Sequence, residues 1–222
     1  MPHKFTWAAL AMTALLSAIP LREALAQARL QTSAGPLHVE VVADDLIEPW
    51  GLAFLPGGGF LVTIRDGTLL HFDASGRRRT VVGTPRVAAV GQGGLLDVLV
   101  PRDFTESREV FLSYAKPQGR GQGTALGVGR LDADGGRLEG FRTIFELEAG
   151  SRGGRHFGSR IVEGRDGFLY LTVGDRGDRP SAQDLSRENG SVVRIARDGR
   201  VPMDNPFVGR ANAQPEIWSY GH

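Results

Sequence analysis

The strongest constraint on the fold is a unit of short apolar strands and turns that occurs three times after about residue 36. Each pass opens with one or two glycines, runs through an apolar strand, turns at Pro, Gly or Asp, and continues through two more strands. The passes begin at Gly51, Gly94 and Gly158, so their start-to-start spacings are 43 and 64 residues. The first spacing matches a β-propeller blade of about 40–45 residues, and the second fits a blade with a long loop.

Short turns between these strands, such as Arg65-Asp66-Gly67, predict antiparallel neighbours within each pass. A small antiparallel sheet cannot bury both faces alone, so successive sheets pack face to face around an axis. We therefore predict an all-β fold, a six-bladed β-propeller of four-stranded antiparallel blades, truncated here to about its first half. An open solenoid is the alternative. The expected strands are Gly51–Pro56, Phe60–Ile64, Thr68–Asp73, Gly94–Pro101, Val110–Tyr114, Leu126–Leu131, Gly158–Val162, Phe168–Val173 and Ser191–Ile195, and a fourth blade is expected to start at Pro215–Trp218.

The N-terminal segment has the pattern of a signal peptide. His3 and Lys4 precede an apolar stretch from Trp7 to Leu21, and Ala24-Leu25-Ala26 gives a small-x-small cleavage pattern. The apolar run falls short of the about 20 residues that span a bilayer, although an uncleaved membrane anchor is the alternative. We predict a signal peptide at 1–26, a linker at 27–36 and a partial propeller domain at 37–222. The mature chain is then periplasmic or secreted and has no membrane span.

Composition narrows the classes of function. The 26 Lys and Arg residues nearly balance the 25 Asp and Glu residues, so a basic surface typical of nucleic-acid binding is not expected. The sequence contains no cysteine, which excludes disulfides, thiolate metal sites and a catalytic thiol, and which suits an oxidising compartment. Glycine accounts for 31 of the 222 residues, roughly double its usual share, as is typical of a turn-rich β protein.

Two glycine-rich loops carry side chains that can bind and deprotonate a ligand. His156 lies in the segment Gly153–Arg160, just before the first strand of the third pass. The glycines beside it let a flat ligand approach closely, and an imidazole can take a proton from a hydroxyl near neutral pH. Gln92 lies in Val90–Asp97, at the same place in the second pass, and its amide can donate and accept toward a ring carbonyl. Taken singly, each pattern is also typical of a structural histidine or a solvated turn glutamine.

A third loop, Gly174–Arg179, follows a strand of the third pass and is rich in charge. Arg176 offers a fixed cation for an anionic ligand, although a charged hairpin loop with local ion pairs has the same pattern. Asp175 and Asp178 suggest calcium, but the loop lacks the acidic density and the distal Glu of a calcium loop. Because the three loops occupy equivalent positions in their blades, we expect them to converge on one face of the ring.

Five segments, in order along the chain, resemble the aldose sugar dehydrogenases related to soluble quinoprotein glucose dehydrogenase. No single motif is long, and it is their collinearity from about residue 37 onward that makes the resemblance specific. The segments are Pro49–Pro56 (PWGLAFLP), Gly91–Asp97 (GQGGLLD), Arg155–Ile161 (RHFGSRI), Val173–Gly177 (VGDRG) and Pro215–His222 (PEIWSYGH).

The resemblance implies roles for four residues. His156 would accept the proton of the anomeric hydroxyl of an aldose while hydride passes from that carbon to pyrroloquinoline quinone, giving a lactone. Gln92 would bond the quinone, and Arg155 and Arg176 stand where the family places polar cofactor contacts. In the glucose dehydrogenase branch an acid and a glutamine occupy those two places, so the chain is closer to the broader aldose branch.

The resemblance also implies that much of the cofactor site lies outside these residues. The family's calcium ligands, several quinone contacts and an Arg-Asn pair follow the position of His222, so we expect no metal ligand in this chain and no turnover by the fragment itself. The partners would be an aldose sugar and an electron acceptor of unknown identity. The alternatives are a non-catalytic propeller that binds glycans or proteins, and a metal-dependent lactonase-type propeller, which would need several carboxylates and an Asn near the axis.

Overall fold

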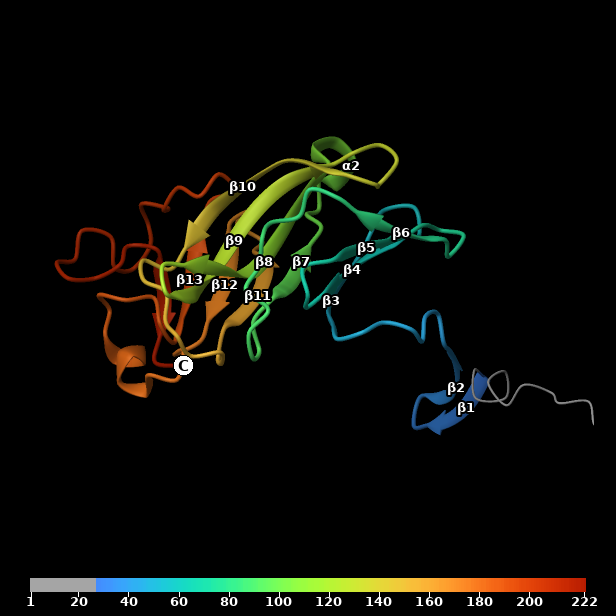
Figure 1. Ribbon diagram of the computed structural model, residues 1–222, viewed down its shortest axis with the longest axis horizontal. Coiled ribbons are helices and arrows are strands. Elements are labelled where there is room, and N and C mark those ends of the chain that lie inside the picture. Colours follow the sequence, from blue (N-terminus) through green and yellow to red (C-terminus); the bar gives the residue numbers. More distant parts are fainter. Residues whose placement is uncertain (1–26) are drawn as a thin grey trace, which may run out of the picture. The chain divides into compact units, whose positions relative to one another are not determined.

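The computed structural model describes residues 27–222 (Figure 1), so the predicted signal peptide lies outside the described residues. The chain divides after Asp45 into two compact units. The described part of the first unit is a hairpin of β1 (Gln27–Thr32) and β2 (Gly35–Glu40). The segment expected to be a linker therefore contains β1 and the start of β2. Between residues 27 and 222, no helix is long and apolar enough to cross a membrane.

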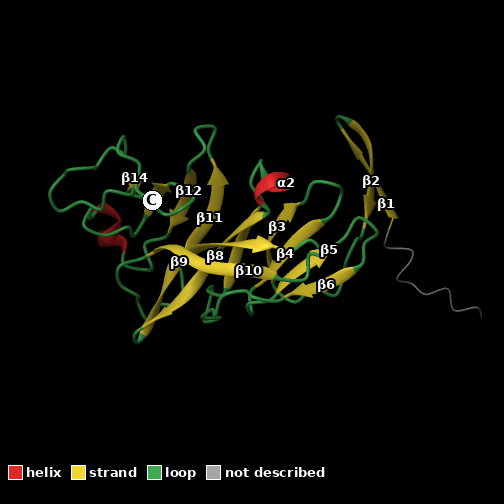
Figure 2. Cartoon of the chain, turned by 90° about the horizontal axis from the view of Figure 1, so that it is seen from above, coloured by secondary structure: helices red, strands yellow, loops and turns green. Residues whose placement is uncertain are grey.

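The second unit, Leu46–His222, contains three four-stranded antiparallel sheets whose strands follow one another in sequence order (Figure 2). This confirms an all-β fold with four-stranded antiparallel sheets, while the number of blades in a closed ring stays a prediction. Two short helical turns, α2 (Phe104–Ser107) and η1 (Arg179–Gln183), interrupt the loops. The sheets are β3 (Pro49–Phe54), β4 (Phe60–Ile64), β5 (Leu69–Phe72) and β6 (Arg78–Val81); β7 (Leu95–Leu99), β8 (Glu109–Gln118), β9 (Gly121–Leu131) and β10 (Leu138–Glu146); and β11 (Gly158–Glu163), β12 (Leu169–Val173), β13 (Ser191–Ile195) and β14 (Ile217–Tyr220).

The segment expected to open a fourth blade belongs instead to the third. Strand β14 pairs with β13, Tyr220 lying opposite Ser191, and it completes the third sheet as its fourth strand. The outer strands β6 and β10 of the first two sheets were not predicted, because they carry little of the apolar alternation that marks a strand. The sequence Arg78-Arg79-Thr80-Val81 has only one buried residue. Because only three strands were predicted in each pass, β14 had no place in the third pass and was assigned to a new blade.

Two hydrophobic cores lie between neighbouring sheets, and β8 contributes to both. Its side chains alternate, as the period of two in a strand requires. Val110, Leu112 and Tyr114 belong to the cluster shared with the first sheet, whereas Phe111 belongs to the cluster shared with the third. All four are at most 2% exposed. The face-to-face packing predicted for blades is therefore present between sheets one and two and between sheets two and three.

Buried polar side chains fix the innermost strands against one another. Thr63 Oγ1 accepts from the backbone N–H of Gly51 at 2.8 Å and donates to the carbonyl of Leu96 in the next sheet. Asp97 accepts from the backbone N–H of Ile161, in the third sheet, at 2.9 Å. Buried backbone groups are costly to leave unpaired, so these links set the register between blades and the position of the loops at their ends.

Replacing Leu112 by alanine tests the core between the first two sheets. Leu112 is 0% exposed, so Leu112→Ala should lower the free energy of unfolding by about 2–5 kcal/mol through lost burial and the cavity left behind. Met203→Ala is the control, because Met203 is 83% exposed. Urea denaturation followed by circular dichroism measures both, and equal destabilisation by the two variants would contradict the packing.

Candidate active site

Three loops from two blades meet at one end of the strands. The loop before β7 carries Gln92, the loop before β11 carries His156, and the loop after β12 carries Asp175. The backbone N–H of Gln92 donates to Gly154 O at 2.7 Å, and the backbone N–H of His156 donates to Gln92 Oε1 at 2.7 Å. The structure thus brings together the loops of the two residues that the sequence placed at a common mouth.

The glycines around Gln92 are required by this close approach. Gly91 has φ +60°, and a Cβ there would collide with the carbonyl of Gly154. A Cβ on Gly93 would lie 2.8 Å from the ring of Phe157. Gln92 therefore carries the one long side chain of this turn, and its neighbours are pressed against the loop of His156.

The contact with His156 fixes the orientation of the Gln92 amide. A backbone N–H is only a donor, so the atom that faces it must be the carbonyl oxygen Oε1. The NH₂ group, Nε2, then points elsewhere, and among residues 27–222 it has no hydrogen-bond partner. Gln92 is exposed, so Nε2 is a donor available to a ligand that carries an acceptor.

Asp175 orients the imidazole of His156. Its Oδ1 lies 2.7 Å from Nδ1 of His156, and only 13% of the Asp175 side chain is exposed against 51% for His156. The backbone N–H of Gly177 at 2.8 Å and the hydrogen bond from His156 together hold the pKa of Asp175 below its ordinary value. An ionised carboxylate can only accept, so Nδ1 carries the proton and Nε2 of a neutral imidazole is the free base.

Sequence reasoning missed the role of Asp175, which it weighed only as a calcium ligand. The available signal was its position two residues after the end of β12, in the blade that also carries His156. In the described part of the chain, no group of three or more His, Asp or Glu residues is arranged to hold a metal ion. The expectation that calcium ligands lie elsewhere is not tested by this.

The backbone at His156 is held in a left-handed conformation with φ +53°. Phe157 is 3% exposed and packs with Leu96 and Ala115, so the residue after His156 is anchored in the core. A Cβ on Gly174 would collide with the carbonyl of His156. A non-glycine residue with positive φ is a strained feature that persists where the surroundings fix it, as the anchor on one side and the Gln92 hydrogen bond on the other do here.

Arg155 and Arg176, the two arginines predicted as site residues, differ in how far they are buried. Arg155 is exposed, and its guanidinium passes beside Gly177. Arg176 is 5% exposed, stacks on the ring of Phe157 with 3.4 Å from Cζ to the centroid, and donates to the carbonyls of Arg155 and Gly153. Burial lowers the pKa of Arg176 to about 10. Its Nε is buried and has no hydrogen-bond partner among the described residues.

The family described as glucose/sorbosone dehydrogenase matches residues 46–222. The chain belongs to this family. It is 44% identical over 195 residues to the aldose sugar dehydrogenase YliI of Escherichia coli, an alignment that covers 86% of this chain and 53% of YliI. The chain therefore spans about half the length of this curated relative.

Solved structures of the family agree with the fold. The soluble aldose sugar dehydrogenase of Escherichia coli in its apo form has a TM-score of 0.78 at 43% identity, covering 82% of this chain and 53% of that chain. The PQQ-bound form of the aldose sugar dehydrogenase of Streptomyces coelicolor has a TM-score of 0.71 at 32% identity, covering 82% and 52%. The resemblance found in the sequence is confirmed at the level of the family.

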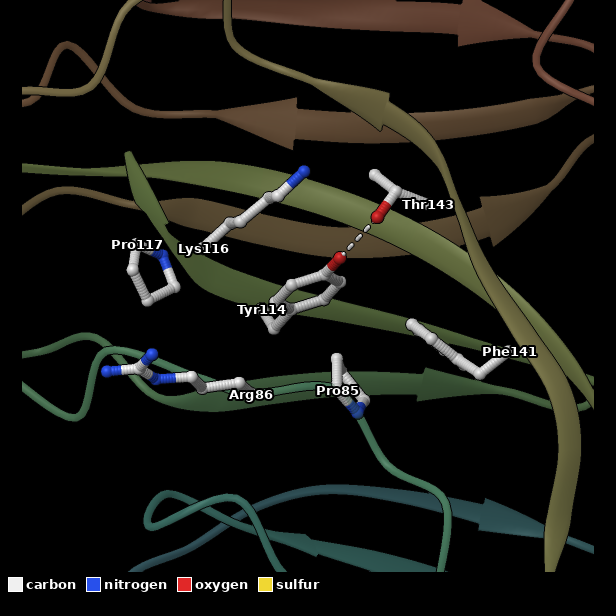
Figure 3. A pocket seen from close by; sticks show the side chains of 7 residues that line it. All are labelled: Pro85, Arg86, Tyr114, Lys116, Pro117, Phe141 and Thr143. Carbon is white, nitrogen blue, oxygen red and sulfur yellow. Dashed lines mark hydrogen bonds between the residues drawn. The ribbon is translucent and has the colours of Figure 1, made fainter. Parts of the chain in front are cut away.

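Two cavities of this family member differ in how they relate to the site: the first lies beside it, and the second has one predicted site residue, Arg176, in its wall. The first, of about 340 Å³, is lined by residues that include Tyr114, Lys116 and Phe141 (Figure 3), and Tyr114 Oη lies 2.8 Å from Thr143 Oγ1. None of the four predicted site residues lines it. The second, of about 330 Å³, is lined by Arg176, Asp178 and Glu188 among others.

Glu188 is a buried carboxyl group in the wall of the second cavity. It is 4% exposed. Burial, and then the nearby carboxylates Glu216 and Glu148, raise the pKa of Glu188 to about 7. The folded state therefore holds this proton more tightly than the unfolded state does. The stabilisation is complete below the ordinary pKa, near 4.5, and is lost as the pH rises toward about 7.

Replacing Glu188 by glutamine should therefore stabilise the chain at high pH. Glu188→Gln keeps the shape and removes the cost of a buried negative charge, so its melting temperature should exceed that of the wild type at pH 8, with little difference at pH 4. Thermal melts across this range measure the effect, with the exposed Glu106→Gln as control. A gain that is the same at both pH values would show that folding does not raise the pKa of Glu188.

Proposed function

We propose that the full-length protein is a quinoprotein oxidoreductase that oxidises the C1 hydroxyl of aldose sugars to lactones with pyrroloquinoline quinone as cofactor. The observation that carries the proposal is the pair of hydrogen bonds that His156 donates, from Nδ1 to Asp175 Oδ1 and from its backbone N–H to Gln92 Oε1. This pair leaves imidazole Nε2 as a free base and Gln92 Nε2 as a free donor at the same mouth. The family membership and the PQQ-bound relative support it.

The residues present fit such a cofactor. Gln92 and Arg155 are exposed, and they offer neutral and cationic donors for the carbonyl and carboxylate groups of the quinone. Arg176 is proposed to hold the loop of His156 through its hydrogen bonds to the carbonyls of Gly153 and Arg155. Its Nε, which has no partner among the described residues, is then the atom left for a ligand. When bound, pyrroloquinoline quinone supplies the acceptor for the hydride and its two electrons. Calcium is proposed as a second cofactor whose ligands belong to other parts of the full-length protein.

The chemistry assigned to this chain is proton removal. His156 Nε2 accepts the proton of the anomeric hydroxyl as the C1–H bond is broken, and the positive charge that forms on the imidazole is stabilised by ionised Asp175. Gln92 Oε1 keeps the backbone of His156 in place. We also propose that the protein is exported to the periplasm or secreted, and that an electron acceptor of unknown identity takes up its electrons.

The test is dye reduction by the full-length protein reconstituted with the quinone and calcium, across a panel of aldoses. His156→Ala should lower kcat by about 10²–10⁴-fold, because the general base is lost. Asp175→Asn should lower kcat while leaving the fold intact. His71→Gln is the control, because His71 contacts Gly135 O in the first two blades and not the site.

Three outcomes would contradict the proposed function or one of its parts. The absence of dye reduction with every aldose would reject the dehydrogenase and favour a binding propeller. Full activity in His156→Ala would reject the assigned base while leaving the family intact. Release of acid from a lactone substrate without any dye would instead indicate the lactonase-type alternative.

A further inference from the structure

One arginine of the first blade grips the loop that carries Gln92. Arg65 lies in the turn between β4 and β5. Its Nη1 donates to Gly91 O at 3.0 Å and to Gly93 O at 3.1 Å, the carbonyls on either side of Gln92. Its Nη2 donates to Glu48 Oε2 at 2.8 Å. The guanidinium thus binds the carbonyls before and after Gln92 through Nη1, while the carboxylate of Glu48 binds Nη2.

The backbone around Arg65 is held just as closely. Leu95 N–H donates to Arg65 O at 3.1 Å, and Arg65 N–H donates to Glu48 O at 3.2 Å. Gly94 has φ +146°, and a Cβ there would collide with the carbonyl of Arg65. The Arg65 side chain is 24% exposed. Arg65 is therefore a fixed point, and the Gln92 turn cannot move outward without breaking its two bonds to the guanidinium.

These contacts form one continuous path across three blades. Arg65 belongs to the first, Gln92 to the second, and His156 with Asp175 to the third. A shift of the Gln92 turn would draw Oε1 away from the N–H of His156 and redirect Nε2. A planar guanidinium can serve both carbonyls and the carboxylate at once, which the compact ammonium of a lysine cannot match.

We propose that Arg65 is a positioning residue of the candidate site. It sets the Gln92 amide and, through it, the backbone of His156, without contacting substrate or cofactor. Its effect on turnover rests on the function proposed above, whereas its effect on the two loops does not. The two parts are therefore tested by separate measurements.

The first experiment is hydrogen exchange at the backbone N–H of His156, followed by NMR or mass spectrometry in the cofactor-free protein. Gln92→Ala removes the acceptor and sets the full effect. Arg65→Met should raise the exchange rate at His156 by roughly tenfold or more, the size expected for losing hydrogen bonds to a charged group. Arg65→Lys should give a smaller rise. Exchange at His156 that is unchanged in folded Arg65→Met would overturn the proposal.

Arg102 offers a matched control. It also donates to two backbone carbonyls, to Gly164 O at 3.0 Å and to Glu163 O at 2.8 Å, at the opposite ends of β7 and β11. Arg102→Met should leave exchange at His156 as it is in the wild type. An equal rise in both methionine variants would mean that any lost arginine loosens the blades, and it would overturn a specific role for Arg65.

The second experiment is a double-mutant cycle on kcat in the full-length, quinone-loaded protein. Arg65→Met should lower kcat by about 10–100-fold through misplacement of the site. In the Gln92→Ala background the same change should have little further effect, because Arg65 acts through Gln92. Effects that multiply independently would overturn that path. A wild type without turnover would reject the proposed function alone, since the exchange measurements would still stand.

Discussion

The hydrogen bond from the backbone of His156 to the side chain of Gln92 is the contact on which the candidate site depends. It joins the second blade to the third, so neither loop has its shape until the blades are packed. A single hydrogen bond contributes only about 1 kcal/mol on average. This one is effective because both ends are already fixed, by buried Phe157 on one side and by the fork of Arg65 on the other.

Stability and geometry come from different parts of the blades. The apolar side chains of β8 bury against both neighbouring sheets and link the two hydrophobic cores, whose burial stabilises the stacked sheets. Thr63 and Asp97 add little apolar area, yet they bind backbone groups of the adjacent blade. These bonds set the register of the inner strands of one blade relative to those of the next. The loops at the strand ends inherit that register, which is why side chains from separate blades meet within hydrogen-bonding distance.

Much of the fold followed from the sequence. The inner strands were predicted because they alternate or run apolar between glycine turns, and β4 and β13 have the predicted bounds. The outer strands β6 and β10 were missed because one of their faces meets solvent and their side chains are largely polar. The assignment of β14 to a new blade was wrong as a consequence. With the outer strands of the first two blades missed, each blade was expected to have three strands, so the fourth strand of the third blade was taken as the start of another.

By itself, the sequence determined which chemical groups the candidate site has: an amide and an imidazole in glycine-rich loops before the first strands of successive blades, and arginines near them. Only the tertiary structure decided which atoms of those groups are free. The backbone N–H of His156 occupies Gln92 Oε1 and leaves Gln92 Nε2 free. Asp175 accepts a hydrogen bond from Nδ1 of the imidazole. Arg176 is buried against Phe157, whereas Arg155 is exposed. The reason is that a residue type specifies which donors and acceptors a side chain has, whereas the partners that occupy some of them come from other loops and meet that side chain only in the folded chain.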